Sequence, residues 1–346
     1  MNGHPLPNAP DFNSFSRLTL DDRGRFLDDD GKTVQPEGIA NFLKSAIYLP
    51  PQVTDVFIWV HGWRNTVESS VTSARRLFAG IEARHRAAAA RYPKLNPFIP
   101  AFVAVYWPSR SLPLPAGYGR IRDRAKNLTE NGYAEFFLAS LLGYLDRKRA
   151  DPQLLQAAGG FYLHCVGHSL GGRFLTAAIR ASAEPHAPDT LSLLDQMSTH
   201  NRDTLGAEEK HFDFTVDSLT VFQMAVGSKG FADEFRALTD KAPLRGPIVL
   251  TFTSHDTANC RWHRLIEGES GVGCVGAQEP VDRVKTIAYR PLAEDYVTSE
   301  FSAARITNVD ASWAFRSKWF APQGAHSAFW LEESIHLLLS AVSSAR

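Results

Sequence analysis

The chain has 346 residues, of which 44% are hydrophobic, and its 37 basic side chains balance 37 acidic ones. This composition is typical of a globular protein, and the balanced charge argues against nucleic acid or anionic lipid as a partner. No uninterrupted apolar run reaches the roughly 20 residues that span a bilayer, so we expect no stable membrane insertion. The N-terminus lacks a basic stretch followed by an apolar segment, which predicts a cytoplasmic protein.

The three cysteines are too few, and odd in number, for a disulfide framework. We therefore expect Cys165, Cys260 and Cys274 to be buried or inert thiols. The spacing of Cys260, His263 and Cys274 matches no zinc signature. The sequence thus predicts neither a metal ion nor a cofactor.

Strands and helices alternate along the chain. Residues 1–54 are expected to form an N-terminal extension with an edge hairpin in 17–34, where Asp and Gly turns interrupt short apolar runs. Strand-length apolar runs follow at 55–60, 102–107, 161–166, 219–226, 248–253 and 305–310. Helical patterns lie at 67–92, 132–149, 170–184, 231–238 and 327–342. This alternation predicts, for residues 55–346, an α/β domain with a mostly parallel sheet covered by helices on both faces.

Two segments between these elements have no regular pattern. Prolines discourage regular structure from 107 to 115, which predicts a loop near the mouth of a site, with arginines and Tyr118 available to substrate or to packing. Residues 185–217 separate a helix from the next strand. Either a small cap or a solvated excursion fits this insertion.

The sequence Gly167-His168-Ser169-Leu170-Gly171 lies between a predicted strand and a predicted helix. In a sharp strand-to-helix turn, side chains two places from the central residue collide with neighbouring segments, and glycine removes that collision. The pattern therefore predicts a nucleophile elbow that presents the Ser169 hydroxyl at the tip of the strand. The alternative is a glycine-rich turn whose serine only caps the helix.

A serine nucleophile needs a base, an acid that orients the base, and donors for the oxyanion. The usual chain order after such an elbow is an acid followed by a histidine. We predict Asp256, after the strand at 248–253, as the acid and His326, in the loop before the last helix, as the base. Asp310 is the main rival for the acid.

The expected oxyanion hole uses two backbone N–H groups. One belongs to Leu170, directly after the nucleophile. The other belongs to Trp63, in the loop that follows the strand at 55–60, where Gly62 allows a tight turn.

With these motifs in this order, the chain resembles the α/β-hydrolase superfamily and, within it, the bacterial DUF900 family. The segments that carry the resemblance span roughly residues 55 to 330: 57–78, 105–111, 118–128, 166–175, 251–276, 308–315 and 324–330. Two departures stand out. Trp63 replaces a tyrosine that is commoner in the family, and residues 223–231 lack the acidic residue that relatives tend to carry there. The resemblance implies an α/β-hydrolase fold with a Ser-Asp-His site.

The sequence thus predicts a serine hydrolase that cleaves small carboxylic esters. The aromatic residues expected near the mouth of its site suit short-chain acyl or aryl groups, and they are Trp63, Trp107, Tyr118, Phe329 and Trp330. Thioesterase, amidase and acyltransferase chemistry use the same three residues. A catalytically silent, hydrolase-like binding module is the alternative from a different class.

Overall fold

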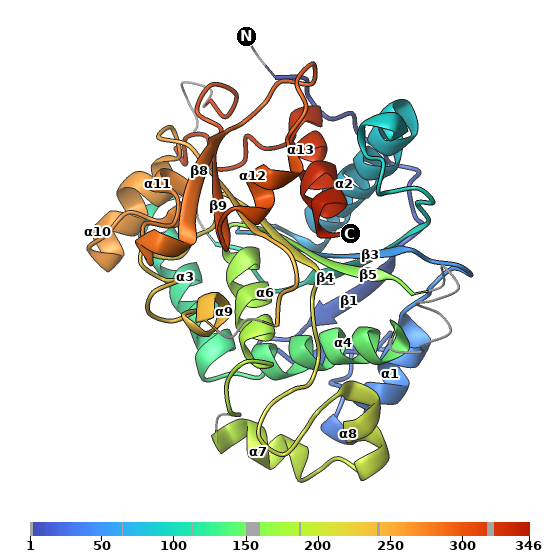
Figure 1. Cartoon of the computed structure of the whole chain (residues 1–346). Coiled ribbons are helices and arrows are strands. Elements are labelled where there is room, and N and C mark those ends of the chain that lie inside the picture. The colour runs from blue at the N-terminus through green and yellow to red at the C-terminus, as the bar shows by residue number, and fades with distance from the viewer. Residues whose placement is uncertain are drawn as a thin grey trace.

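A computed structural model describes residues 3–63, 65–111, 114–149, 160–186, 188–240, 243–316 and 322–346. In this part of the chain, nine strands form one sheet in the order β2-β1-β4-β3-β5-β6-β7-β9-β8. All neighbouring pairs are parallel except β1 with β2. The expected α/β class with a mostly parallel sheet is confirmed (Figure 1).

The strands are short and lie close to the predicted runs. Their bounds are β1 Ser16–Leu20, β2 Phe26–Leu27, β3 Asp55–Val60, β4 Pro100–Tyr106, β5 Tyr162–His168, β6 Ser218–Phe222, β7 Ile248–Phe252, β8 Val284–Ala288 and β9 Ile306–Asp310. The β6 run ends four residues earlier than its apolar character suggests, because the chain turns at Gln223. Strand β8 escaped prediction because it is a half-exposed edge strand without an apolar run.

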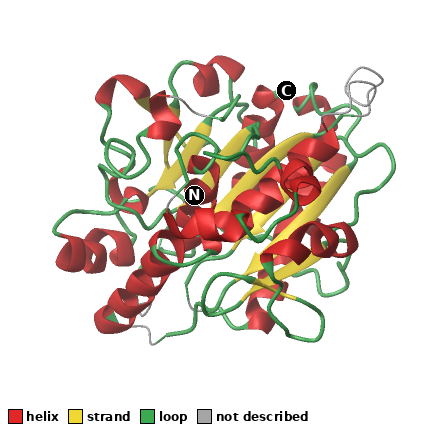
Figure 2. Cartoon of the chain, turned by 90° about the horizontal axis from the view of Figure 1, so that it is seen from below, coloured by secondary structure: helices red, strands yellow, loops and turns green. Residues whose placement is uncertain are grey.

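Helices cover both faces of the sheet (Figure 2). One core packs against α1 Ile39–Ala46, α3 Pro115–Glu130, α4 Ala134–Arg149 and α6 Leu170–Arg180. The other packs against α2 Val67–Ala88, α12 Thr298–Ser302 and α13 Glu332–Ala345. The remaining helices are α7 Pro188–Leu194, α8 Thr199–Leu205, α9 Ala237–Asp240, α10 His263–Glu267 and α11 Val272–Val275.

Central strand β3 is apolar from Val56 to Val60. Val56 and Ile58 join the core under α4 and α6, whereas Phe57 and Trp59 join the core under α2 and α13. Since successive side chains point to opposite faces, a strand covered on both sides buries apolar side chains at successive positions rather than at alternate ones. The whole of β3 is buried.

The N-terminal segment belongs to this sheet. Strands β1 and β2 pair antiparallel at its edge, with Thr19 opposite Leu27, and β1 also pairs in parallel with β4. Leu18, Leu20 and Phe26 are buried in the same core as β3. Residues 16–27 therefore form a hairpin at the edge of the sheet and contribute apolar side chains to its core.

Two predicted helices differ from the structure. Residues 231–236 form turns, and only Ala237–Asp240 are helical. The final helix starts at Glu332 instead of residue 327, because Leu331 is extended and residues 322–329 form consecutive turns. In both segments, apolar residues recur at helical spacing because their side chains are buried, although the backbone forms turns.

The insertion at 185–217 lies on the helical layer, where α8 packs against α4 and α1 (Figure 1). Asn201 donates a hydrogen bond to the carbonyl oxygen of Glu37 (2.5 Å), and Arg147 of α4 forms an ion pair with Asp213 (3.0 Å). The described part of this insertion therefore packs against α4 and α1.

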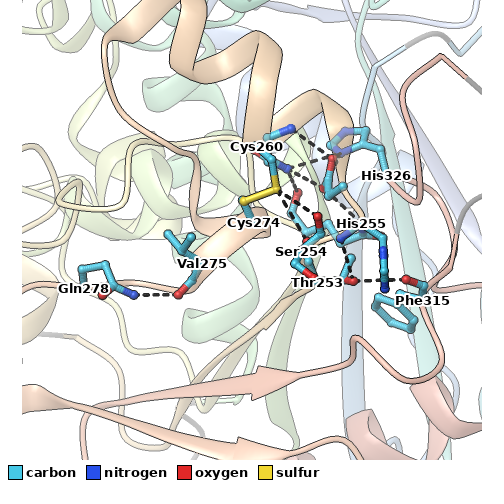
Figure 3. Close-up of a disulfide and its surroundings, with 12 residues drawn as sticks. Thr253, Ser254, His255, Cys260, Cys274, Val275, Gln278, Phe315 and His326 are labelled. Carbon is cyan, nitrogen blue, oxygen red and sulfur yellow. Dashed lines mark hydrogen bonds and ion pairs between the residues drawn. A yellow bond between two sulfur atoms is a disulfide. The ribbon is translucent and has the colours of Figure 1, made fainter.

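The expectation of three unpaired thiols is wrong for two of them. Cys260 and Cys274 form a disulfide, while Cys165 is free and buried in β5 (Figure 3). The two cysteines are 14 residues apart, and the number of cysteines in the chain does not predict the turn that brings them together. No helix within the described ranges is long and apolar enough to cross a membrane.

Candidate active site

Ser169 occupies a strained turn between β5 and α6. Its φ is 54° and its ψ is −124°, a conformation that non-glycine residues rarely adopt. The Ser169 N–H donates to the carbonyl oxygen of Phe222 (2.9 Å), which ties the turn to the end of β6. The turn therefore fixes the serine at the carboxyl edge of the sheet, where ligands of parallel α/β proteins usually bind.

The glycines around Ser169 are required by close packing. A Cβ on Gly171 would lie 2.1 Å from the carbonyl oxygen of Val60, and one on Gly172 would lie 2.2 Å from Cγ1 of Val221. A Cβ on Gly167 would approach Gly172 to 2.7 Å. Each distance is shorter than a carbon atom allows, so α6 can approach the strands only with glycine at these positions.

The structure brings Ser169, His326 and Asp256 together in one hydrogen-bonded chain. Nε2 of His326 lies 2.7 Å from Oγ of Ser169, and Nδ1 lies 2.9 Å and 3.1 Å from the two carboxylate oxygens of Asp256. The Asp256 contacts favour the proton on Nδ1, which leaves Nε2 as the acceptor that faces the serine hydroxyl. All three residues are buried, and Ser169 has no exposed surface.

His326 lies in a loop that is held from two sides. Gly324 has a φ of 65°, and its hydrogen faces the carbonyl oxygen of His255, where a Cβ would lie 2.3 Å away. The N–H of Ala325 donates to that same oxygen (2.9 Å). On the other side, Nε2 of His168 donates to the carbonyl oxygen of His326 (2.7 Å). The residue before the serine thus positions the backbone of the histidine.

Asp310 does not contact this chain of hydrogen bonds. Its Oδ1 accepts from the N–H of Ser312 (3.0 Å), and its backbone oxygen accepts from Tyr289 (3.0 Å). Of the two carboxylates considered from the sequence, Asp256 is the one beside His326.

Two buried amide side chains that were not predicted as site residues also form hydrogen bonds with the Asp256 carboxylate. Nε2 of Gln223 lies 3.1 Å from its carboxylate, and Nδ2 of Asn259 lies 2.8 Å from it. Gln223 directly follows β6 at the same edge of the sheet as Ser169. Its place at the end of a strand is the one feature of the sequence that could have marked it as a site residue. Asn259 follows Asp256 by three residues, the spacing of a side chain that caps a helical turn.

The two residues predicted as oxyanion donors belong to segments that lie next to Ser169. Leu170 is the first residue of α6, so its N–H precedes the hydrogen bonds within the helix. The loop of Trp63 approaches from β3, and a Cβ on Gly62 would lie 2.8 Å from Cβ of Ser169. Nε1 of Trp63 donates to Oγ of Ser111 (2.5 Å), and Asn65 donates to the carbonyl oxygen of Gly62 (3.0 Å).

A cavity of about 180 Å³ adjoins His326. Its lining combines aromatic, imidazole and small polar side chains: Trp59, His61, Trp63, Asn65, Ser73, His168, Gln323, His326, Ser327 and Trp330. Of the aromatic residues expected near the mouth, Trp63 and Trp330 line this cavity. The others lie in the interior, since Trp107 packs on Phe174, and Tyr118 and Phe329 are buried.

Burial keeps the surrounding histidines neutral. It lowers the pKa of His61 to about 4, and burial together with the neighbouring His326 lowers the pKa of His168 well below its usual value. The pKa of His263 also falls to about 4 because the ring is buried. A neutral His168 can donate to the His326 carbonyl without bringing a second positive charge to the site.

The site contains no evident metal centre. Within the described ranges, no group of three or more His, Cys, Asp or Glu side chains is arranged to hold a metal ion.

In comparisons with known proteins, no family model and no curated protein matches this chain. The resemblance to the DUF900 family therefore stays a prediction. The fold and the site define an α/β protein with a buried Ser-His-Asp chain at the carboxyl edge of a mostly parallel sheet.

Proposed function

We propose that this protein is a serine hydrolase of the α/β-hydrolase type that cleaves carboxylic esters. The observation that carries the proposal is the contact of 2.7 Å between Oγ of Ser169 and Nε2 of His326, with Asp256 on the other ring nitrogen. The strained turn at Ser169 supports the proposal, because strained backbone conformations cluster at functional sites. The predicted relation to the DUF900 family is part of the same proposal.

The reaction proceeds in two halves. His326 Nε2 takes the proton of Ser169 Oγ as this oxygen attacks the ester carbonyl carbon, and Asp256 stabilises the imidazolium that forms. The N–H groups of Leu170 and Trp63 bind the oxyanion. The C–O bond to the alcohol breaks, the alcohol leaves with the proton from His326, and an acyl-Ser169 remains. Water then repeats the attack and releases the acid.

The cavity beside His326 favours small acyl or aryl groups. Its volume of about 180 Å³ holds a short chain, whereas pockets for drug-sized ligands typically measure about 300–1,000 Å³. We therefore expect acetyl and butyryl nitrophenyl esters to be hydrolysed faster than the palmitoyl ester. Matched thioester and amide substrates in the same panel identify the preferred bond. Rates that rise with chain length would contradict the size argument.

The cysteines also bear on the compartment in which the protein is found. Cytoplasmic location, expected from the N-terminus, stays a prediction. The disulfide between Cys260 and Cys274 counts against it, because reducing compartments keep most thiols unpaired.

A further inference from the structure

We infer that Gln223 and Asn259 are positioning residues, which hold the carboxylate of Asp256 in the orientation that accepts the His326 Nδ1 proton. The inference rests on the proposed roles of Ser169, His326 and Asp256. It adds two residues that act through Asp256 without touching the substrate.

The Asp256 carboxylate receives hydrogen bonds on both oxygens. Oδ1 accepts from the backbone N–H of Asn259 (3.0 Å), and Oδ2 accepts from Nδ2 of Asn259 (2.8 Å) and from Nε2 of Gln223 (3.1 Å). These bonds add to the two contacts with His326 Nδ1. Because Asp256 is fully buried, such donors replace water around the charge and fix its rotation.

The orientation of both amides follows from their neighbours. Nε2 of Gln223 faces two acceptors, Asp256 Oδ2 and the carbonyl oxygen of Ala325 (2.8 Å). Nδ2 of Asn259 faces Asp256 Oδ2 and the carbonyl oxygen of Gln223 (3.2 Å). Only an NH₂ group satisfies two acceptors at once, so the amide nitrogens must point inward. Through Ala325, Gln223 also holds the backbone beside His326.

The arrangement of these two amides lowers the stability of the folded protein. The side-chain oxygens of Gln223 and Asn259 are buried, and each lacks a hydrogen-bond partner within the described part of the chain. Gln223 also adopts a φ of 49°, and Ser169, directly after the neighbouring strand β5, has a φ of 54°. A strained backbone and an unpaired buried amide oxygen both lower the stability of the fold. Their presence at Gln223 therefore favours a functional role for this residue.

The segment around Asn259 is built to fit this amide. A Cβ on Gly271 would lie 2.3 Å from Oδ1 of Asn259, and a Cβ on Gly273 would lie 2.3 Å from Nδ2. The adjacent Cys260 is joined to Cys274 by the disulfide (Figure 3). The ends of β6 and β7 and the start of α11 thus close around one carboxylate.

The test compares Gln223→Met, which keeps the length of the side chain and removes both N–H donors, with Asn308→Leu. Asn308 is a buried amide of β9 that accepts a hydrogen bond from the N–H of Ala277 and donates one to the carbonyl oxygen of the same residue. For Gln223→Met we expect kcat to fall about ten- to hundredfold with KM within about threefold of the parent, as for other supporting residues. Asn308→Leu should lower stability but keep kcat within about twofold.

A second readout does not depend on turnover. The Nδ1 proton of His326 should give a downfield NMR resonance that disappears in His326→Gln. We expect this resonance to be lost or broadened in Gln223→Met and kept in Asn308→Leu. If Gln223→Met does not fold, Gln223→Glu replaces it, since a carboxyl group donates at most one of the two hydrogen bonds.

The outcomes separate this inference from the proposed function. If Gln223→Met keeps both the parent kcat and the resonance, Gln223 is not a positioning residue, although Ser169 can still be the nucleophile. If the parent shows no esterase activity but the resonance depends on Gln223, the positioning role stands and the proposed reaction falls.

Discussion

Asp256 and His326 are 70 residues apart in sequence, yet Oδ2 of Asp256 lies 2.9 Å from Nδ1 of His326. Asp310, the last residue of the neighbouring strand β9, instead accepts a hydrogen bond from the backbone N–H of Ser312. We expect Asp256→Asn to lower kcat by about 10³- to 10⁴-fold with little change in KM, because the histidine loses its orientation and its partner for the imidazolium.

Asp310→Asn is the matched control for this prediction. It should change kcat less than about tenfold, since Asp310 lies outside the proton path. Thermal melts of both variants reveal any folding defect. If both fold and the Asp310 variant is the more impaired, the acid has been assigned to the wrong strand.

Part of this site could be predicted from sequence because the turn that carries Ser169 is a local feature. Ser169 lies between a strand and a helix, and the glycines beside it report close packing that no larger residue permits. Asp256 and His326 follow from chain order and from their positions after apolar strands. Chain order alone left Asp310 open as a rival, and only the hydrogen bonds distinguish the two carboxylates.

The parts that escaped prediction depend on contacts between distant segments. Gln223 supports Asp256 only because β6 and β7 are neighbours and because its backbone turns to a positive φ. The disulfide similarly depends on the turn that returns residue 274 to residue 260. A pattern of residue types along one segment does not contain this information.

The disulfide should stabilise the segment that carries Asp256. Replacing Cys260 and Cys274 by alanine removes a cross-link across a separation of 14 residues. Cross-links of this length contribute about 3 kcal/mol. We expect the free energy of unfolding to fall by roughly that amount, and kcat to fall as well, because Cys260 follows Asn259 directly.

Cys165→Ala serves as the control, since Cys165 is buried and free. It should leave kcat close to that of the parent. Thiol titration of the unfolded parent should find one reactive thiol before reduction and three after it. Three thiols before reduction would show that the disulfide does not form.

Buried neutral histidines should make the protein less stable in mild acid. Nδ1 of His61 donates to the carbonyl oxygen of Gly62, Nε2 accepts from the N–H of Trp107, and burial lowers the pKa of the ring to about 4. Below pH 6.5, the unfolded chain binds a proton at His61 that the folded chain does not. This residue therefore costs stability as the pH falls from about 6.5 to about 4, by up to about 1.4 kcal/mol per pH unit.

Urea unfolding of the parent and of His61→Gln between pH 7 and pH 4.5 isolates this contribution, since all other titrating groups are shared. The variant should lose stability less steeply as the pH decreases, whatever its stability at pH 7. Parallel curves would mean that His61 binds its proton equally in both states.

Reaction with a fluorophosphonate probe tests whether Ser169 is an activated nucleophile. Only a serine whose proton is removed by a neighbouring base reacts readily with such a probe, and Ser169 is the serine that faces His326 Nε2 at 2.7 Å. We predict one labelled peptide, which contains Ser169, and loss of both labelling and ester turnover in a folded Ser169→Ala variant. Labelling that persists in this variant, or a folded parent protein that stays unlabelled, would contradict the account.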